Sequence, residues 1–326
     1  MLRGLIRFAA LTALILAGLL AYGYVSTIQP SLARERCDTA PVEPGRLEAH
    51  VKMLAETFAP RDYTHPEHLK QTADYVKAQL SAAGGSVSEQ HFTVEGRDYW
   101  NVLAAFGPES AERIVIGAHY DVCEPKPGAD DNASGVAALL ELAQRLGKNP
   151  PPMRVELVGY TLEEPPFFRT RNMGSAVHAD ALAQANVKVR AMMSLEMLGY
   201  FTDQPDTQKF PMAPLSWLFP STGNYLIVVG ERGKGDIVPT IKRAMRGASA
   251  LPVESINAPS FVPGVDFSDQ LYYWKHGFPA VMITDTAFLR NANYHQTTDL
   301  PETLDYPRLG MAVQGVECAV RTLAKQ

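Results

Sequence analysis

The sequence is poor in cysteine and lacks the usual motif of a serine hydrolase. Its 326 residues include only three cysteines, Cys37, Cys123 and Cys318, so a disulfide framework is excluded and at most one pair can form. No Gly-x-Ser-x-Gly segment is present, and no activating pattern accompanies Cys123. Internal repeats and polybasic runs are also missing, and the net charge of −5 argues against nucleic acid as a partner. The chemistry therefore has to come from other residue types.

An apolar leader begins the chain. Arg3 and Arg7 precede an uncharged apolar stretch at residues 8–25, which is long enough for a signal peptide core and nearly long enough to span a bilayer. The best candidate for a cleavage site is Ser31-Leu32-Ala33. Arginines before the stretch favour an N-terminus inside the cell and the rest of the chain outside. We therefore predict an extracytoplasmic protein, periplasmic or secreted, with residues 8–25 as its membrane anchor if the leader is retained.

The chain divides into this leader and one large domain. Residues 1–34 are expected to be the signal peptide or N-terminal membrane anchor, and residues 35–326 suit a single domain better than two small ones. Short β-branched runs alternate there with stretches of helical apolar spacing, which predicts an α/β fold. The predicted strands are residues 113–118, 155–161, 189–195 and 279–284, and the predicted helices include residues 45–58, 66–83 and 309–323. Residues 203–223, rich in proline and aromatics, are expected to form a long loop beside a cleft.

Five short segments contain the residues that a pair of zinc ions needs. They are Gly117–Asp121, Gly128–Asn132, Leu162–Pro165, Ser194–Met197 and Tyr294–Thr297. Zinc binds imidazole nitrogen and carboxylate oxygen, and two neighbouring ions need a carboxylate that bridges them. Four of the segments lie where a predicted strand ends or just beyond it, and ligands of open α/β sheets collect outside the carboxyl ends of the strands. The sequence therefore predicts a metal site at this edge of the sheet.

These segments resemble, in the same order, those of the zinc exopeptidases. That family contains the secreted bacterial leucine aminopeptidases, the glutamate carboxypeptidases and the glutaminyl cyclases, and the similarity extends from about Asn101 to the C-terminus. The resemblance implies a mixed, mostly parallel central sheet flanked by helices, and two Zn²⁺ ions. It also implies a cis peptide bond after the bridging aspartate, between Asp131 and Asn132.

The resemblance assigns a role to each residue in turn. The family places its bridging ligand directly before the asparagine, which selects Asp131 and leaves Asp130 as a loop acid. Glu196 stands where well-studied aminopeptidases usually have aspartate. Tyr294 either helps to polarise the scissile carbonyl or only packs. The implied roles are His119 and Glu196 as ligands of the first zinc, Asp131 as the bridge, Glu164 and His295 as ligands of the second zinc, Glu163 as the general base, and Asp121 as the acid that orients His119.

The resulting prediction is a zinc metallo-aminopeptidase that removes N-terminal residues from peptide substrates. Glu163 is expected to take the proton from a zinc-activated water. Three alternatives remain open from the sequence. A carboxypeptidase needs a cation for the substrate carboxylate, and Arg290 is available for it. The others are a glutaminyl cyclase-like activity and a non-catalytic ectodomain.

Overall fold

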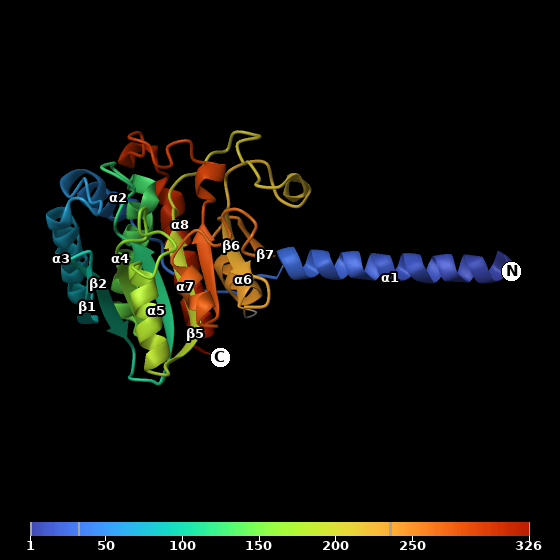
Figure 1. Cartoon of the computed structure of the whole chain (residues 1–326), viewed down its shortest axis with the longest axis horizontal. Coiled ribbons are helices and arrows are strands. Elements are labelled where there is room, and N and C mark those ends of the chain that lie inside the picture. Colours follow the sequence, from blue (N-terminus) through green and yellow to red (C-terminus); the bar gives the residue numbers. More distant parts are fainter. Residues whose placement is uncertain (1, 32, 235–236, 326) are drawn as a thin grey trace.

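An eight-stranded sheet forms the centre of the computed structural model, which describes residues 2–31, 33–234 and 237–325 (Figure 1). The four strands in the middle of the sheet run parallel, β6 pairs in parallel with β7, and the remaining pairings are antiparallel. The predicted single α/β domain with a mixed, mostly parallel sheet is therefore confirmed. In spatial order the strands are β1 (Ser86–Val94), β2 (Arg97–Phe106), β4 (Arg154–Tyr160), β3 (Glu112–His119), β5 (Lys188–Glu196), β8 (Ala280–Thr284), β6 (Leu226–Glu231) and β7 (Val253–Ala258).

Helices cover both faces of the sheet. Successive side chains of a strand point to opposite faces. In β3, Ile114 and Ile116 accordingly join the hydrophobic cluster of one face, and Val115 joins the cluster of the other. The first face is covered by α2 (Pro44–Lys52), α3 (Pro66–Ala82), α4 (Gly135–Lys148), α6 (Val238–Ala248) and α8 (Tyr306–Leu323), and the second by α5 (Gly174–Gln184) and α7 (Gln270–Lys275).

The predicted elements are present with small shifts at their ends. All four predicted strands are confirmed, as β3, β4, β5 and β8. The helix expected at residues 45–58 ends at Lys52 and continues as a π-helical turn, η1 (Met53–Thr57). The helices expected at residues 66–83 and 309–323 are α3 and α8. Residues 203–223 form the expected long connection, which contains only the short helix η3 (Ala213–Trp217).

The leader forms helix α1 (Leu2–Ile28), which projects from the side of the domain where β6 and β7 lie (Figure 1). Its stretch Ile6–Ile28 is long and apolar enough to cross a membrane. The candidate cleavage site at residues 31–33 includes Leu32, which lies outside the described residues. Cys37 and Cys318 form a disulfide and Cys123 is a free thiol, which confirms that no more than one pair forms.

Candidate metal centre

The fold gathers the predicted ligands at the carboxyl edge of the sheet. His119 is the last residue of β3, and Glu196 is the last residue of β5. Glu163 and Glu164 follow the end of β4, the strand beside β3. Because β3 pairs in parallel with both β4 and β5, these three strand ends deliver their side chains to one place. Asp131 joins them from the irregular turn η2 (Ala129–Ser134), which leads into α4.

Asp131 lies between the two histidines. Its Oδ1 is 3.4 Å from His119 Nε2, and its Oδ2 is 3.1 Å from His295 Nε2. His119 Nε2 is also 3.4 Å from Glu196 Oε1, and His295 Nε2 is 3.2 Å from Glu164 Oε2. The structure therefore brings all five predicted ligands together, as two groups that share one carboxylate. His295 is the most accessible member, with 24% of its side chain exposed.

Glu163 and Tyr294 face the same space as the ligands. A pocket is lined by Glu163, Tyr294 and four of the five ligands. Glu163 is buried, and its Oε2 lies 3.9 Å from His119 Nε2. The Tyr294 ring stacks on the imidazole of His295 with 3.8 Å between ring centroids. Burial and the nearby carboxylates raise the pKa of Tyr294, so its hydroxyl keeps its proton.

Asp121 contacts two parts of the site, although only its contact with His119 was expected. Its Oδ1 lies 3.5 Å from His119 Nδ1, which fits the predicted orienting role. The same carboxylate accepts hydrogen bonds from the backbone N–H groups of Glu163, at 3.2 Å, and Glu164, at 3.1 Å. One buried side chain therefore contacts the imidazole at the end of β3 and fixes the backbone of both glutamates beyond β4.

Two buried acids, Asp299 and Asp130, hold the turn that carries Asp131. Asp299 accepts hydrogen bonds from the backbone N–H groups of Asp130, at 2.9 Å, and Asp131, at 3.1 Å. Asp130, expected to be a loop acid, is fully buried and accepts from Gly199 N, at 2.9 Å, and Asn291 Nδ2, at 2.8 Å. Its role is therefore to fix the turn inside the domain.

Asn132 connects this turn to β5. Its Oδ1 accepts from Gly135 N and Met197 N, each at 3.1 Å, and its Nδ2 donates to Leu195 O at 2.9 Å. These bonds join the start of α4 to the strand that ends in Glu196. The peptide bond between Asp131 and Asn132 is cis, which confirms the expectation from the resemblance.

Ser268 and Asp269 lie behind the first ligand group. Ser268 donates a hydrogen bond to Glu196 Oε2, which fixes the position of that carboxylate. Asp269 is fully buried, and neither of its carboxylate oxygens has a hydrogen-bond partner among the described residues. Burial raises its pKa to about 7, although the nearby His119 acts in the opposite direction. Neither residue belongs to a periodic or recognisable pattern, so nothing in the sequence indicates their role.

The charges in the centre are unbalanced. Burial raises the pKa of Glu163 well above its usual range and that of Glu164 to about 7, and neighbouring carboxylates add to both shifts. Burial alone would lower the pKa of His119, but Glu196 and other acids around it raise it well above its usual value. These shifts express repulsion among buried acids and attraction for positive charge. Cations placed among these groups would relieve the repulsion.

Arg290, expected to be available for a substrate carboxylate, is not among the residues that line the pocket in front of the ligands. It is buried, and its guanidinium donates to Gln208 Oε1, at 2.8 and 3.0 Å, and to Tyr225 O, at 2.9 Å. It also lies against the Tyr225 ring. Through Gln208, its guanidinium holds the loop at residues 203–223.

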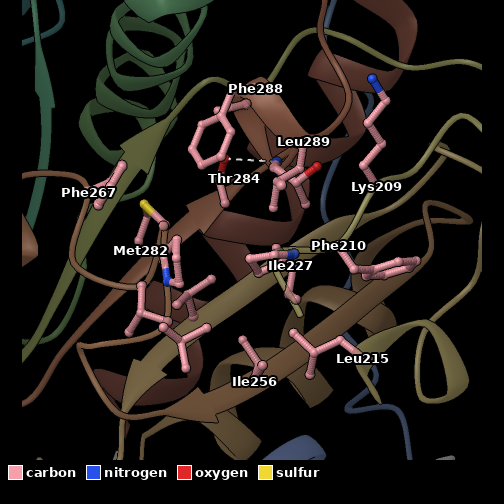
Figure 2. Close-up of a pocket in the computed structure, with 18 of the residues that line it drawn as sticks. Lys209, Phe210, Leu215, Ile227, Ile256, Phe267, Met282, Thr284, Phe288 and Leu289 are labelled. Atoms are coloured by element: carbon pink, nitrogen blue, oxygen red, sulfur yellow. Dashed lines mark hydrogen bonds between the residues drawn. The ribbon is translucent and has the colours of Figure 1, made fainter. Parts of the chain in front are cut away.

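An apolar pocket adjoins the metal centre (Figure 2). It contains about 700 Å³ of space between atoms, part of it open to solvent. Glu196, Phe267, Ala287 and Phe288 line both this pocket and the space in front of the ligands, so the two are continuous. Its lining includes Ile227 of β6, Ile256 of β7 and Met282 of β8, together with Phe210 and Leu215 from the loop at residues 203–223 (Figure 2). The predicted loop at residues 203–223 therefore borders a pocket next to the site.

Comparison with known proteins assigns a family to this site. Residues 101–318 match Peptidase family M28. The uncharacterized protein YfbL of Escherichia coli is 43% identical over 281 residues, which cover 84% of this chain and 86% of that protein. Leucine aminopeptidase 1 of Arthroderma otae is 24% identical over 282 residues, which cover 79% of this chain and 68% of that protein.

Solved structures agree at the level of the fold. BSAP, a zinc aminopeptidase from Bacillus subtilis, superimposes with a TM-score of 0.68 at 14% identity, covering 87% of this chain and 95% of that one. Fimbriiglobus ruber glutaminyl cyclase gives the same TM-score at 20% identity, covering 90% of this chain and 99% of that one. The family match extends over the whole segment that carries the metal centre, and it supports metal-dependent peptide hydrolysis. The chain belongs to peptidase family M28.

Proposed function

We propose that the chain is a zinc-dependent aminopeptidase that removes N-terminal residues with large apolar side chains from peptides. The observation that carries this proposal is the position of Asp131, whose two oxygens face two different histidines. Glu196 accompanies the first histidine and Glu164 the second. This gives two ligand groups of imidazole and carboxylate that share one bridge, as a pair of zinc ions requires.

The donor atoms of this chain fit two such ions. Glu164 Oε1 is buried and has no hydrogen-bond partner among the described residues, and His295 Nε2 lies close to two carboxylate oxygens without forming a hydrogen bond of normal geometry. Unpaired polar atoms of this kind are costly inside a protein unless a ligand satisfies them. His119, Asp131 and Glu196 would hold the first ion, and Asp131, Glu164 and His295 the second. Zinc bound there lowers the pKa of a water toward neutrality and polarises the peptide carbonyl.

Glu163 is proposed as the general base. Its carboxylate lies beside the ligands without a place in either group, and its backbone is fixed by Asp121. A carboxylate in this position accepts the proton of the attacking water and delivers it to the leaving amine nitrogen. Tyr294 has a protonated hydroxyl in the same pocket, and we assign it a hydrogen bond to the carbonyl oxygen as charge develops there.

The surroundings of the site favour an aminopeptidase over a carboxypeptidase. Among the described residues that line the pocket in front of the ligands, four are carboxylates and none is lysine or arginine. A carboxypeptidase needs a cation to pair with the C-terminal carboxylate of its substrate, and the described residues of this lining offer no such side chain. The apolar pocket beside it would take the side chain of the first residue.

Hydrolysis of leucine peptides with free and with acetylated N-termini tests the proposal. We expect cleavage of the free-amine peptide only, lost on chelation and restored by zinc. Cleavage from the carboxyl end would refute the aminopeptidase assignment. A peptide with N-terminal glutamine separates the remaining activity, because a cyclase releases ammonia from it without breaking a peptide bond. No turnover of any peptide by the zinc-loaded protein would indicate a non-catalytic domain.

A further inference from the structure

Most of the described side chains of helix α1 are exposed. Its apolar stretch Ile6–Ile28 contains 23 residues, and no residue in the most apolar 18-residue part of this stretch is buried. At 1.5 Å per residue it is about 34 Å long, which matches a hydrocarbon core of about 30 Å. Leu14 and Leu20, for example, are 71% and 68% exposed. Figure 1 shows the helix extending away from the domain, so a bilayer is the environment that suits it.

The last turn of α1, in contrast, is built into the domain. Ile28 and Gln29 are buried, and the backbone carbonyl of Ile28 accepts hydrogen bonds from Lys242 Nζ, at 3.2 Å, and Ser255 Oγ, at 3.0 Å. Lys242 and Ser255 are themselves buried, on α6 and β7. Removal of the leader would leave these two polar side chains without the carbonyl they bind, which is unfavourable in a protein interior.

Beyond α1, the described residues Ser31, Glu35 and Cys37 are all tied to the domain. The carbonyl of Ser31 accepts from Arg246 Nη1 at 2.8 Å, and Glu35 N donates to Arg243 O at 3.1 Å. Cys37 is then joined to α8 by its disulfide with Cys318. These contacts place the domain directly at the end of α1, so a bilayer around the helix would always meet the same face of the domain.

A groove at the base of α1 lies at that surface. It is lined by Tyr22 and Val25 of the helix and by Arg232 and Arg243 of the domain, and none of its described lining residues is acidic. Arg232 Nη2 donates to Thr27 Oγ1 at 2.7 Å, which holds one guanidinium against the helix end. The groove contains about 1460 Å³ of space between atoms, part of it open solvent. It thus combines an apolar wall that continues the membrane span with two cations at its end.

We propose that α1 is a permanent membrane anchor and that the groove at its base binds the headgroup of an anionic phospholipid. Arg232 and Arg243 contact the phosphate, and the acyl chains lie beside Tyr22 and Val25. Tyrosines are typical of the membrane–water interface, and Tyr22 lies near the end of the span where that interface falls. The disulfide places the domain on the oxidising side of the membrane, so the lipid belongs to the outer leaflet.

The first test asks whether the anchor is retained. The full chain is expressed in bacteria, the membranes are washed with salt and alkaline carbonate, and the intact mass of the purified protein is measured. We expect the protein to remain in the membrane fraction with a mass that includes α1. A released protein whose N-terminus lies beyond Ile28 would overturn the proposal.

The second test addresses the lipid. The full chain is placed in nanodiscs of equal parts phosphatidylcholine and phosphatidylglycerol, and the lipids that remain bound are counted by native mass spectrometry. We expect bound phosphatidylglycerol, with a preference over phosphatidylcholine that falls roughly tenfold or more in the double variant Arg232→Gln/Arg243→Gln. The matched control, Lys77→Gln/Arg97→Gln, removes two cations on α3 and β2, at the opposite end of the domain from α1 (Figure 1).

The control should keep the preference of the unaltered chain. Equal binding of the two lipids by the unaltered chain would overturn the headgroup site, and this result does not depend on whether any variant folds. An undiminished preference in the Arg232→Gln/Arg243→Gln variant would overturn it as well. Neither test uses peptidase activity, so the outcome is independent of the proposed function.

Discussion

Substitution of Asp121 tests whether one buried carboxylate organises the metal centre. The Asp121→Ala change removes the acceptor for the backbone N–H groups of Glu163 and Glu164, at 3.2 and 3.1 Å, and the contact with His119 at 3.5 Å. A buried donor left without a partner costs about 1–3 kcal/mol, so two of them lower the free energy of unfolding by about 2–6 kcal/mol. Loss of a group that orients a ligand lowers metal affinity roughly 10–100-fold.

The measurements are urea unfolding and zinc titration of the metal-free protein. Asp121→Asn keeps one acceptor oxygen, so its loss of stability should lie between those of the unaltered protein and Asp121→Ala. Glu67→Ala, an exposed acid on α3, is the control and should change stability by less than about 0.5 kcal/mol. The reasoning is refuted if Asp121→Ala matches this control in both stability and zinc affinity.

Three further predictions concern separate parts of the molecule. The Glu163→Gln variant should keep its zinc but lose at least roughly 10²–10⁴-fold in turnover. The Glu164→Gln variant should instead lose zinc and regain some activity when excess metal is added. Metal content and turnover are measured for both variants, and the reverse result would contradict the assigned roles. Leu215→Asp puts a charge into the apolar pocket and should lower kcat/KM for leucine peptides roughly tenfold or more. Met212→Asp changes a residue of the same loop that is outside the pocket lining, and it should not lower kcat/KM in this way. Equal effects of the two variants would argue against this pocket as the binding site of the substrate side chain. Burial, aided by Arg46, lowers the pKa of His50 from 6.5 to about 4, so protonation of His50 favours the unfolded chain. The free energy of unfolding should therefore fall as the pH drops from about 6.5 toward 4. A His50→Gln variant whose stability keeps the same pH dependence would contradict this.

The central strands could be predicted because they are buried on both faces. A strand in that position reads as a nearly continuous apolar run, as in β3 and β5. The edge strand β1 was missed because most of its residues are exposed or partly exposed, so its sequence Ser-Val-Ser-Glu-Gln-His resembles that of a loop. β7 was missed because it is short and contains Glu254 and Asn257 within its six residues.

The convergence of the five candidate ligands could be predicted because metal chemistry restricts the candidates to few residue types near strand ends. The groups that hold them could not. Asp130 and Asp299 bind backbone N–H groups, and any acidic residue in a loop has the same appearance in the sequence. The hydrogen bond from Arg290 to the carbonyl of Tyr225 could not be predicted either, because only the fold brings these two groups together.

The most direct test of the account is anomalous diffraction at the zinc edge from crystals of the zinc-loaded protein. The account predicts two peaks about 3.5–4 Å apart. Asp131 should lie between them, with His119 and Glu196 on one ion and Glu164 and His295 on the other. A single peak, or a Glu196 side chain turned away from the metal, would contradict the paired-zinc centre and with it the proposed mechanism.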